Sequence, residues 1–464
     1  MDISSILNIE KLVPRNYLNL AIEAGRSSEQ SRRILLETRK LPERGWSESA
    51  IENFIQYLSS LDSNNFNGKT GLGEREARIA CRLVAKRHYN FGHGIGRSGD
   101  LLEPQPKAAG STLMSNLTNS LLLDLIHYLG VASAKLCFLC PMATGMTLNL
   151  CLLTLKKQNP KAKYVLWSRI DQKSCFKCIT MAGLQPVVID VVNGPKGLQT
   201  NMAAFEQEIQ KLGSEKILCI FSTTSCFAPR NCDNILALSQ LAEKSNIPHL
   251  VNNAYGLQST YLTHQLEQGN KSGRIDLFVQ STDKNLMVPV GGAIVAGFNE
   301  ETVRAVAKTY AGRASSSQSV DVLMTLLFLG KSGYLEYRTN RLSCFEYLHS
   351  RMTEFAYKHS ESMFLTKGNP ISMAMTLNTF RSLDNLSKLG SMLYTRGISG
   401  VRVVTTLDVK SIDDHTFYGW GSHFSKSEVP YITVAAAIGI TKSEIDVFMK
   451  KLKECWIKLS SSLK

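Results

Sequence analysis

One lysine lies between two apolar runs in the stretch Ile275-Asp-Leu-Phe-Val-Gln-Ser-Thr-Asp-Lys284-Asn-Leu-Met-Val-Pro-Val-Gly-Gly292. Leu277 to Val279 is typical of a short buried strand, and the polar residues after it predict a turn that lifts Lys284 off the strand end. The two glycines indicate that the backbone passes close to another group. Apolar neighbours desolvate a lysine, which lowers the pKa of its amine and makes it a nucleophile. Taken alone, the pattern also fits an exposed lysine between two strands, which is the commoner case.

Two upstream segments have the same form, a predicted buried strand that ends in polar or small residues. They are His249-Leu-Val-Asn252 and Leu136-Cys-Phe-Leu-Cys140. The second is followed by a turn with Thr144 and Gly145 and then by a helix, whose N-terminus is suited to bind a phosphate group. Together with the lysine, these segments indicate an enzyme that uses pyridoxal phosphate (PLP). The large aspartate-aminotransferase-like class of PLP enzymes has Asp-x-Ala where this chain has Asn252-x-Ala254.

Strands and helices are expected to alternate between residues 120 and 300. Further expected strands are Tyr164–Trp167, Pro186–Val191 and Ile217–Phe221, and expected helices include Leu148–Lys157 and Asn234–Lys244. This alternation predicts an α/β domain with a mainly parallel sheet that helices cover on both faces, the fold type I of the aspartate-aminotransferase-like class. Ligands of such sheets bind at the carboxyl ends of the strands. The polar residues expected there are Thr144, Gln172, Thr223, Asn252 and Lys284.

A length of 464 residues predicts a large domain with a smaller one beside it. We expect a helical oligomerisation element over residues 1–45, a PLP-binding large domain over 46–318 that includes a phosphate loop at 92–106, and a smaller α+β C-terminal domain over 319–464. The strands expected in the last domain are Ile371–Leu377, Gly400–Thr405 and Tyr431–Ala435, followed by an amphipathic helix over Lys442–Leu459.

Residues 72–90 are expected to form a helix, on which Arg75, Arg78 and Arg82 would share one face. A glycine-rich loop follows, and its positions 94–99 match the dinucleotide-binding pattern G-x-G-x-x-G. We reject that interpretation, because no buried strand precedes the loop and two nearby prolines prevent a long helix after it.

The glycine-rich loop still suits a phosphate group. It offers exposed backbone N–H groups, the guanidinium of Arg97 and the hydroxyl of Ser98, and Gln105 follows closely. A plain surface loop is the alternative.

The formal net charge of +14 comes from 53 Lys and Arg residues against 39 Asp and Glu. This balance favours a polyanionic partner such as nucleic acid, although a basic enzyme would have the same charge. Among the 11 cysteines, Cys137 and Cys140 form a C-x-x-C, but they lie inside an apolar strand, so we expect no metal site. Scattered cysteines fit the reduced thiols of a cytoplasmic protein. We find no pattern of a signal peptide and no run apolar enough to span a membrane.

The chain resembles the O-phosphoseryl-tRNA(Sec) selenium transferase family from about residue 45 to 440. The matching segments are Asp62-Ser-Asn-Asn-Phe66, Gly73-Glu-Arg-Glu76, His93-Gly-Ile-Gly-Arg-Ser-Gly99, Pro104-Gln-Pro-Lys-Ala-Ala-Gly110, Arg169-Ile-Asp-Gln-Lys-Ser-Cys-Phe176, Ser222-Thr-Thr-Ser-Cys-Phe-Ala-Pro-Arg230 and Gly312-Arg-Ala-Ser315. The resemblance implies a PLP-dependent homotetramer that binds selenocysteine tRNA carrying phosphoserine, eliminates the phosphate and adds selenium from selenophosphate. The alternatives are a PLP lyase or decarboxylase acting on a small amino acid, and a tRNA-binding protein that has lost catalysis.

The resemblance also implies roles for individual residues. Lys284 would bond the cofactor and act as the base, and the other cofactor ligands would be Arg75, Thr144, Gly145, Gln172 and Asn252. The substrate phosphate would be bound by Arg97, Ser98, Gln105 and Arg313, with Lys173 as a weaker candidate.

Three further implied roles concern substrate choice. Glu74 would repel free amino acids, because an amino acid esterified to tRNA has lost its carboxylate charge. Lys271, where the family has Arg, and Arg396 would contact the tRNA. The family's basic residue beyond the last helix has no match by type in Ser460-Ser-Ser-Leu-Lys464.

Asn252 predicts a difference from the aspartate-containing class. An Asp beneath the pyridine nitrogen keeps that nitrogen protonated and makes the ring a strong electron acceptor, which a neutral Asn does not. An ester at the α-carbon and a good leaving group compensate, so we expect Asn252 to favour elimination over transamination.

Overall fold

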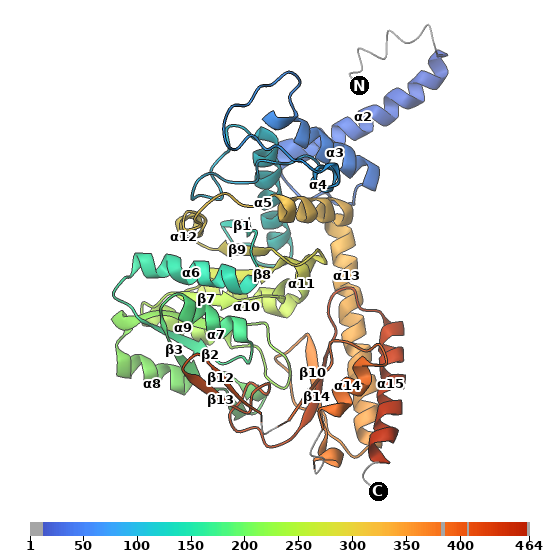
Figure 1. The fold of residues 1–464 in the computed structure, drawn as a ribbon. Coiled ribbons are helices and arrows are strands. Elements are labelled where there is room, and N and C mark those ends of the chain that lie inside the picture. The colour runs from blue at the N-terminus through green and yellow to red at the C-terminus, as the bar shows by residue number, and fades with distance from the viewer. Residues whose placement is uncertain (1–12, 382–385, 406–407, 462–464) are drawn as a thin grey trace.

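The structure is a computed structural model that describes residues 13–381, 386–405 and 408–461. A seven-stranded sheet lies at its centre, in the order β1-β9-β8-β7-β6-β2-β3 (Figure 1). The strands β8, β7, β6, β2 and β3 are parallel to one another. Strand β9 is antiparallel to both of its neighbours, β1 and β8. The strands are Leu136–Cys140 (β1), Tyr164–Ser168 (β2), Gln185–Ile189 (β3), Ile217–Thr223 (β6), His249–Asn252 (β7), Leu277–Ser281 (β8) and Ala293–Gly297 (β9).

The central strands are buried at every position, which requires cover on both faces of the sheet. The prediction of a mainly parallel α/β sheet is confirmed, and the predicted strands differ from the observed ones only at their ends. The helices of this part are Glu48–Ser60 (α3), Ala109–Tyr128 (α5), Thr144–Gln158 (α6), Lys173–Met181 (α7), Met202–Leu212 (α8), Ile235–Lys244 (α9), Thr260–Ser272 (α10), Thr282–Leu286 (α11) and Glu300–Ala307 (α12). A small hairpin of Val192–Gly194 (β4) and Gly197–Gln199 (β5) follows β3.

A long helix, Ser317–Lys358 (α13), runs from the sheet to the C-terminal part of the chain (Figure 1). The helix breaks at Gly330, which has a φ of 59°. Next to the break, its backbone forms hydrogen bonds with residues 42–46. Lys331 N donates to Pro42 O at 2.9 Å, and Trp46 N donates to Leu327 O at 2.8 Å. A Cβ at position 330 would lie 2.7 Å from the backbone of Arg44, so the close approach requires glycine.

A second hydrophobic core forms after residue 344. It lies between α13, the helices Lys388–Tyr394 (α14) and Lys442–Ser460 (α15), and an antiparallel sheet of Ser372–Thr376 (β10), Tyr431–Ala435 (β14) and Arg402–Val404 (β11). Helix α15 begins at a capping box, in which Thr441 and Glu444 bond each other's backbone N–H. All three predicted C-terminal strands are therefore present, two of them shorter than expected.

The sequence did not predict a hairpin of Val409–Ile412 (β12) and His415–Tyr418 (β13). The hairpin leaves the C-terminal core and packs against the central sheet (Figure 1). Its Phe417 meets Trp167 of β2 and Phe176 of α7 edge to face, with ring centroids 6.2 and 5.1 Å apart. This contact brings late residues of the chain next to the carboxyl ends of the strands.

The expected helix over residues 72–90 is wrong. Only Arg82–Arg87 (α4) is helical, residues 71–81 are irregular, and Ala77 has a φ of 54°. Consequently Arg75 and Arg78 do not share a helical face with Arg82. No residue from 72 to 90 is fully buried, so no packed core supports a helix there.

The expected helical arm at the N-terminus is present as Arg15–Thr38 (α2), which extends away from the rest of the chain (Figure 1). The first 12 residues of that expectation lie outside the described residues. None of the described helices is both long enough and apolar enough to cross a membrane.

Candidate active site

The backbone of Lys284 is held from several sides. Its carbonyl accepts a hydrogen bond of 2.6 Å from Nε2 of the buried Gln258. The next residue, Asn285, donates from Nδ2 to Ala254 O at 2.9 Å and to Ser281 O at 2.7 Å. These bonds fix α11 against β7 and β8, so the position from which the Lys284 side chain projects is well defined.

The Lys284 side chain itself is exposed, which contradicts the expectation that its apolar neighbours desolvate it. The turn after β8 is the first turn of α11, and this helix buries Asn285 and Leu286 while it directs Lys284 outward. Removal of water from this amine therefore requires a ligand or a second chain over the site.

Lys284 lines a cavity of about 450 Å³ between α6, α7, α11 and the glycines after α11. One wall is the N-terminus of α6, where Thr144 Oγ1 is buried without a hydrogen-bond partner. Next to it, a Cβ on Gly145 would lie 3.0 Å from Ser174 Cβ, so glycine leaves room at this wall. Free backbone N–H groups at a helix start and an unpaired hydroxyl fit a phosphate group, as the PLP prediction requires.

The amide of Asn252 has a fixed orientation at the end of β7. Its Oδ1 accepts from Ala254 N at 3.2 Å, and its Nδ2 donates to Cys175 Sγ at 3.3 Å. The Cys175 thiol in turn faces Gln172 Oε1 at 4.0 Å, and burial raises its pKa to about 11. The charge of Lys284 acts on the same thiol. The side chains of Asn252, Cys175, Gln172 and Lys284 therefore lie close to one another.

The loop that carries Gln172 is held by a buried ion pair. Arg169 bonds both carboxylate oxygens of Asp171, at 2.8 and 3.1 Å. Asp171 N donates to His423 Nδ1 at 2.7 Å, and Asp171 Oδ2 accepts from His423 N at 2.8 Å. Burial lowers the pKa of His423 to about 4, so this imidazole is neutral. Residues that follow the β12–β13 hairpin thus help to position a wall of the Lys284 cavity, which sequence reasoning missed.

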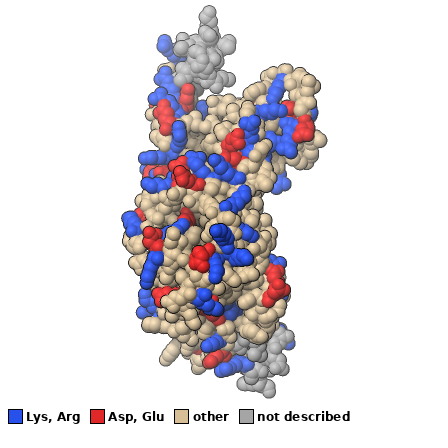
Figure 2. Space-filling view, turned by 90° about the vertical axis from the view of Figure 1, so that its left-hand side faces the viewer, with Lys and Arg blue, Asp and Glu red and all other residues tan. Residues whose placement is uncertain are grey.

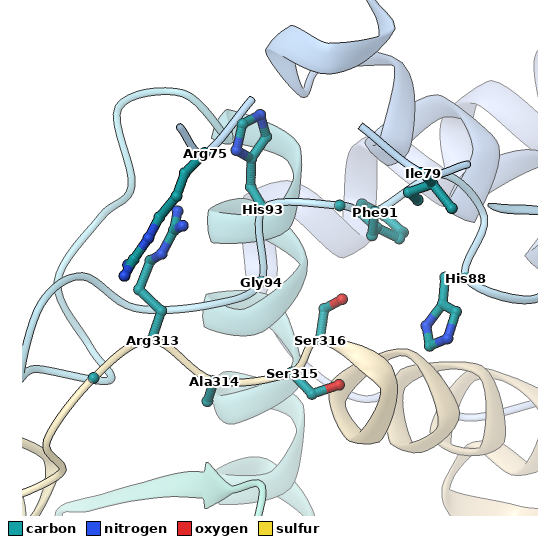
Figure 3. A pocket seen from close by; sticks show the side chains of 12 residues that line it. Arg75, Ile79, His88, Phe91, His93, Gly94, Arg313, Ala314, Ser315 and Ser316 are labelled. Atoms are coloured by element: carbon teal, nitrogen blue, oxygen red, sulfur yellow. The ribbon is translucent and has the colours of Figure 1, made fainter. Parts of the chain in front are cut away.

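A second cavity, of about 590 Å³, is lined by Arg75 and Arg313 (Figure 3). Their side chains run alongside each other on one side of the cavity (Figure 3). The glycine-rich loop and the segment after α12 are joined by backbone bonds, Ile95 N to Ala314 O at 2.9 Å and Ala314 N to Ile95 O at 3.1 Å. None of the described residues that line this cavity is acidic, so the arginine cavity suits an anion.

His93 also lines the arginine cavity and was not singled out from the sequence. Its side chain is only 3% exposed, and its Nε2 lies 3.2 Å from Ser63 Oγ. Its Nδ1 is buried and has no partner among the described residues. The available signal was the place of His93 in Gly92-His93-Gly94, at the start of the predicted phosphate loop.

Other predicted ligands lie outside the two cavity linings. Arg97 is exposed and pairs with Glu103 at 3.3 Å, and Ser98 beside it is exposed. Gln105 Oε1 accepts from Lys107 N at 3.4 Å. Arg75, which was expected near the cofactor, lines the arginine cavity and not the Lys284 cavity of the same chain.

Glu74 is exposed, and its carboxylate lies 3.5 Å from Arg75, at the side of the arginine cavity. Lys173 is exposed at the start of α7, and the charge of nearby Lys410 lowers the pKa of its amine.

The two expected tRNA contacts lie on different helices. Lys271 near the end of α10 is exposed and pairs with Glu267 at 3.0 Å. Arg396 follows α14 and donates to Met392 O at 2.9 Å. Of the C-terminal segment without a match, residues 462–464 lie outside the described part of the chain. Lys and Arg side chains are scattered over the face in Figure 2, with Asp and Glu side chains between many of them.

Comparison with solved structures defines the class of protein. The chain is similar to an archaeal O-phosphoseryl-tRNA(Sec) selenium transferase, with a TM-score of 0.88, 28% identity, and coverage of 96% of this chain and 99% of that chain. It is also similar to a Burkholderia pseudomallei sphingosine-1-phosphate lyase, with a TM-score of 0.57, 12% identity, and coverage of 97% and 92%. A Lactobacillus brevis glutamate decarboxylase has a TM-score of 0.56 and 14% identity over 85% of this chain and 95% of that one. The fold is therefore that of the aspartate-aminotransferase-like, fold type I enzymes.

Within this class the sequence comparisons are specific. Residues 61–457 match the family described as O-phosphoseryl-tRNA(Sec) selenium transferase. A Dictyostelium discoideum protein of that name is 44% identical over 99% of this chain and 100% of its own length. A Caenorhabditis elegans protein of that name is 40% identical over 94% of this chain and 91% of its own length. The chain belongs to the O-phosphoseryl-tRNA(Sec) selenium transferase family.

Proposed function

We propose that this chain converts O-phosphoseryl-tRNA(Sec) to selenocysteinyl-tRNA(Sec), with PLP held at Lys284 and selenophosphate as the selenium donor. The observation that carries the proposal is the presence of two different cavities in a member of this family. One has an anchored lysine and a phosphate-binding wall, and the other has two arginines and no acid among its lining residues. The alternative of a lyase or decarboxylase is not favoured, because the neighbours with those activities are only 12–14% identical and share the fold alone.

The residues of the Lys284 cavity fit PLP. The N-terminus of α6, with Thr144 and Gly145, would hold the phosphate. Gln172 and Asn252 are not among the lining residues, but both meet the Cys175 thiol, and they would contact the ring. When bound, PLP supplies an aldehyde that bonds the Lys284 amine and a ring that accepts electrons from the substrate. The freed amine of Lys284 would then take the α-proton of the phosphoseryl group.

Asn252 would meet the pyridine nitrogen with an N–H group. Its Oδ1 accepts from Ala254 N and its Nδ2 donates one N–H to Cys175 Sγ, so the second N–H of Nδ2 is available to the ring. A nitrogen that accepts a hydrogen bond stays unprotonated, which weakens the ring as an electron acceptor. This arrangement favours loss of phosphate over transamination.

The substrate phosphate would bind in the arginine cavity. Arg313 and Arg75 line it, and Arg97, Ser98 and Gln105 belong to the same loop region. Each charge-assisted bond to phosphate contributes about 1.5–3 kcal/mol. Glu74, next to Arg75, would repel the carboxylate of a free amino acid.

A homotetramer would complete the site. On one chain, the linings of the two cavities share no residue, and Lys284 is exposed. We propose that chain association, with the N-terminal element 1–45 as one contact, covers Lys284 and joins an arginine cavity to it. Lys271 and Arg396 would contact the tRNA bound by the large (46–318) and C-terminal (319–464) domains.

Borohydride reduction of the purified yellow protein tests the cofactor assignment. Tryptic mass spectrometry should find a pyridoxyl phosphate adduct on the peptide that contains Lys284, and the Lys284→Ala variant should be colourless. In a turnover assay, phosphate should be released from phosphoseryl-tRNA and not from free phosphoserine. An adduct on another lysine, or equal turnover of the free amino acid, would contradict the proposal.

A further inference from the structure

Loss of phosphate requires a proton in addition to positive charge. A phosphate monoester is mostly a dianion at pH 7, because its second pKa is about 6. When the Cβ–O bond breaks, the electron pair goes to oxygen and would leave a trianion. The arginines that bind phosphate stabilise charge but do not give up a proton, since the pKa of Arg exceeds about 12. An acid next to the arginine cavity would supply this proton directly to the departing oxygen.

Two histidines are the titratable groups, besides the arginines, that line this cavity. His88 is half-buried, its Nδ1 lies 3.0 Å from Ser317 Oγ, and Figure 3 shows it on the opposite side from the arginines. His93 lies on the side of Arg75 and Arg313 (Figure 3). Its Nε2 faces the Ser63 hydroxyl, which leaves Nδ1 as the buried nitrogen without a partner.

The charges around His93 make its proton affinity depend on the ligand. Burial lowers the pKa of His93, Arg313, Lys69 and Lys107 lower it further, and only Asp62 raises it. The imidazole is therefore neutral when the cavity holds no anion. A phosphate dianion between the two arginines would oppose their field and favour the imidazolium.

We infer that His93 is the acid that protonates the departing phosphate, an inference that rests on the proposed function. The dianion enters the arginine cavity, and Nδ1 of His93 takes up a proton from solvent as it binds. The Lys284 amine removes the α-proton, the C–H electrons form the Cα–Cβ double bond, and the Cβ–O electrons move to oxygen. His93 transfers its Nδ1 proton to that oxygen, so hydrogen phosphate leaves and a neutral imidazole remains.

A change of leaving group tests this role. Sulfate is a weak base and leaves without a proton, so tRNA carrying O-sulfoserine needs no acid. His93→Gln and His93→Asn should slow phosphate release from phosphoseryl-tRNA about 100-fold, within the range of general acid catalysis. They should leave sulfate release within about threefold of wild type, and the slow phosphate reaction should recover as pH falls towards 6, because the substrate then carries its own proton.

His264→Gln is the matched control, because His264 is exposed on α10 and lines neither cavity, and it should change neither reaction. Equal losses of both reactions in the His93 variants would show that His93 only shapes the loop, and would overturn the inference, as would unchanged phosphate release. Failure of wild type to release phosphate from the tRNA substrate would instead refute the proposed function.

Calorimetry gives a second readout that needs no turnover. Sulfate binding to the wild-type protein, measured at pH 7.5 in buffers of different ionisation enthalpy, should be accompanied by proton uptake. The uptake should be lost in His93→Gln and kept in His264→Gln. Equal uptake by wild type and His93→Gln would contradict the inference.

Discussion

Replacement of Gln258 by Leu should destabilise the chain and loosen the Lys284 helix. Gln258 is 1% exposed and bonds two backbone groups, Lys284 O at 2.6 Å and Ile438 N at 2.7 Å. Leucine has a similar volume but leaves both groups buried and unpaired. At about 1–3 kcal/mol for each unsatisfied group, the free energy of unfolding should decrease by about 2–6 kcal/mol.

Denaturant unfolding of the cofactor-loaded protein measures this loss, with Gln240→Leu as the control because Gln240 is exposed on α9. Gln258→Glu adds a second measurement. The protonated carboxyl can donate to Lys284 O and accept from Ile438 N, whereas the carboxylate cannot donate, so this variant should lose stability as pH rises. A loss below 1 kcal/mol for the leucine variant would refute the idea that this side chain joins α11 to the C-terminal region.

Three further predictions concern the site and its surroundings. Arg313→Ala should lower turnover of phosphoseryl-tRNA by at least about tenfold, while Lys308→Ala should not, and unchanged turnover would remove Arg313 from the substrate site. Asn252→Asp should raise keto acid formation relative to wild type, measured with a dehydrogenase-coupled assay, and no rise would contradict the role of the neutral amide. His423 has a pKa of about 4 in the folded chain against an ordinary value of 6.5. Between pH 6.5 and 4, the unfolded chain therefore binds one proton at His423 that the folded chain does not. The free energy of unfolding should decrease by about 3 kcal/mol as pH falls through this range, and His423→Asn should reduce that decrease.

The central sheet could be predicted because its strands are apolar on both faces. Every position of β7 and β8 is buried, and such uninterrupted runs are hard to mistake when helices lie between them. The order of segments placed Thr144, Asn252 and Lys284 at the same edge of the sheet, and the structure has Thr144 and Lys284 lining one cavity.

The errors have local causes. Residues 72–90 have charged side chains at helical spacing, and their apolar residues Ile79, Leu83 and Val84 are not buried, so no core packs a helix there. The positive φ of Ala77 also interrupts the pattern. The β12–β13 hairpin was missed because each strand has four residues and buries one large side chain, Ile412 or Phe417. The exposure of Lys284 could not be read from its neighbours, because a helix begins at Thr282 and redirects the side chain.

Residues from the C-terminal part hold the Lys284 cavity on two sides. On the side of α7, the backbone of Asp171 bonds His423, and its carboxylate accepts from the N–H groups of Gly421 and His423, both at 2.8 Å. On the side of α11, Gln258 connects Lys284 O to Ile438 N. Both connections are buried, and each joins the segment from 421 to 438 to an element beside the Lys284 cavity. We therefore expect a ligand that moves this segment to displace both α11 and the loop before α7.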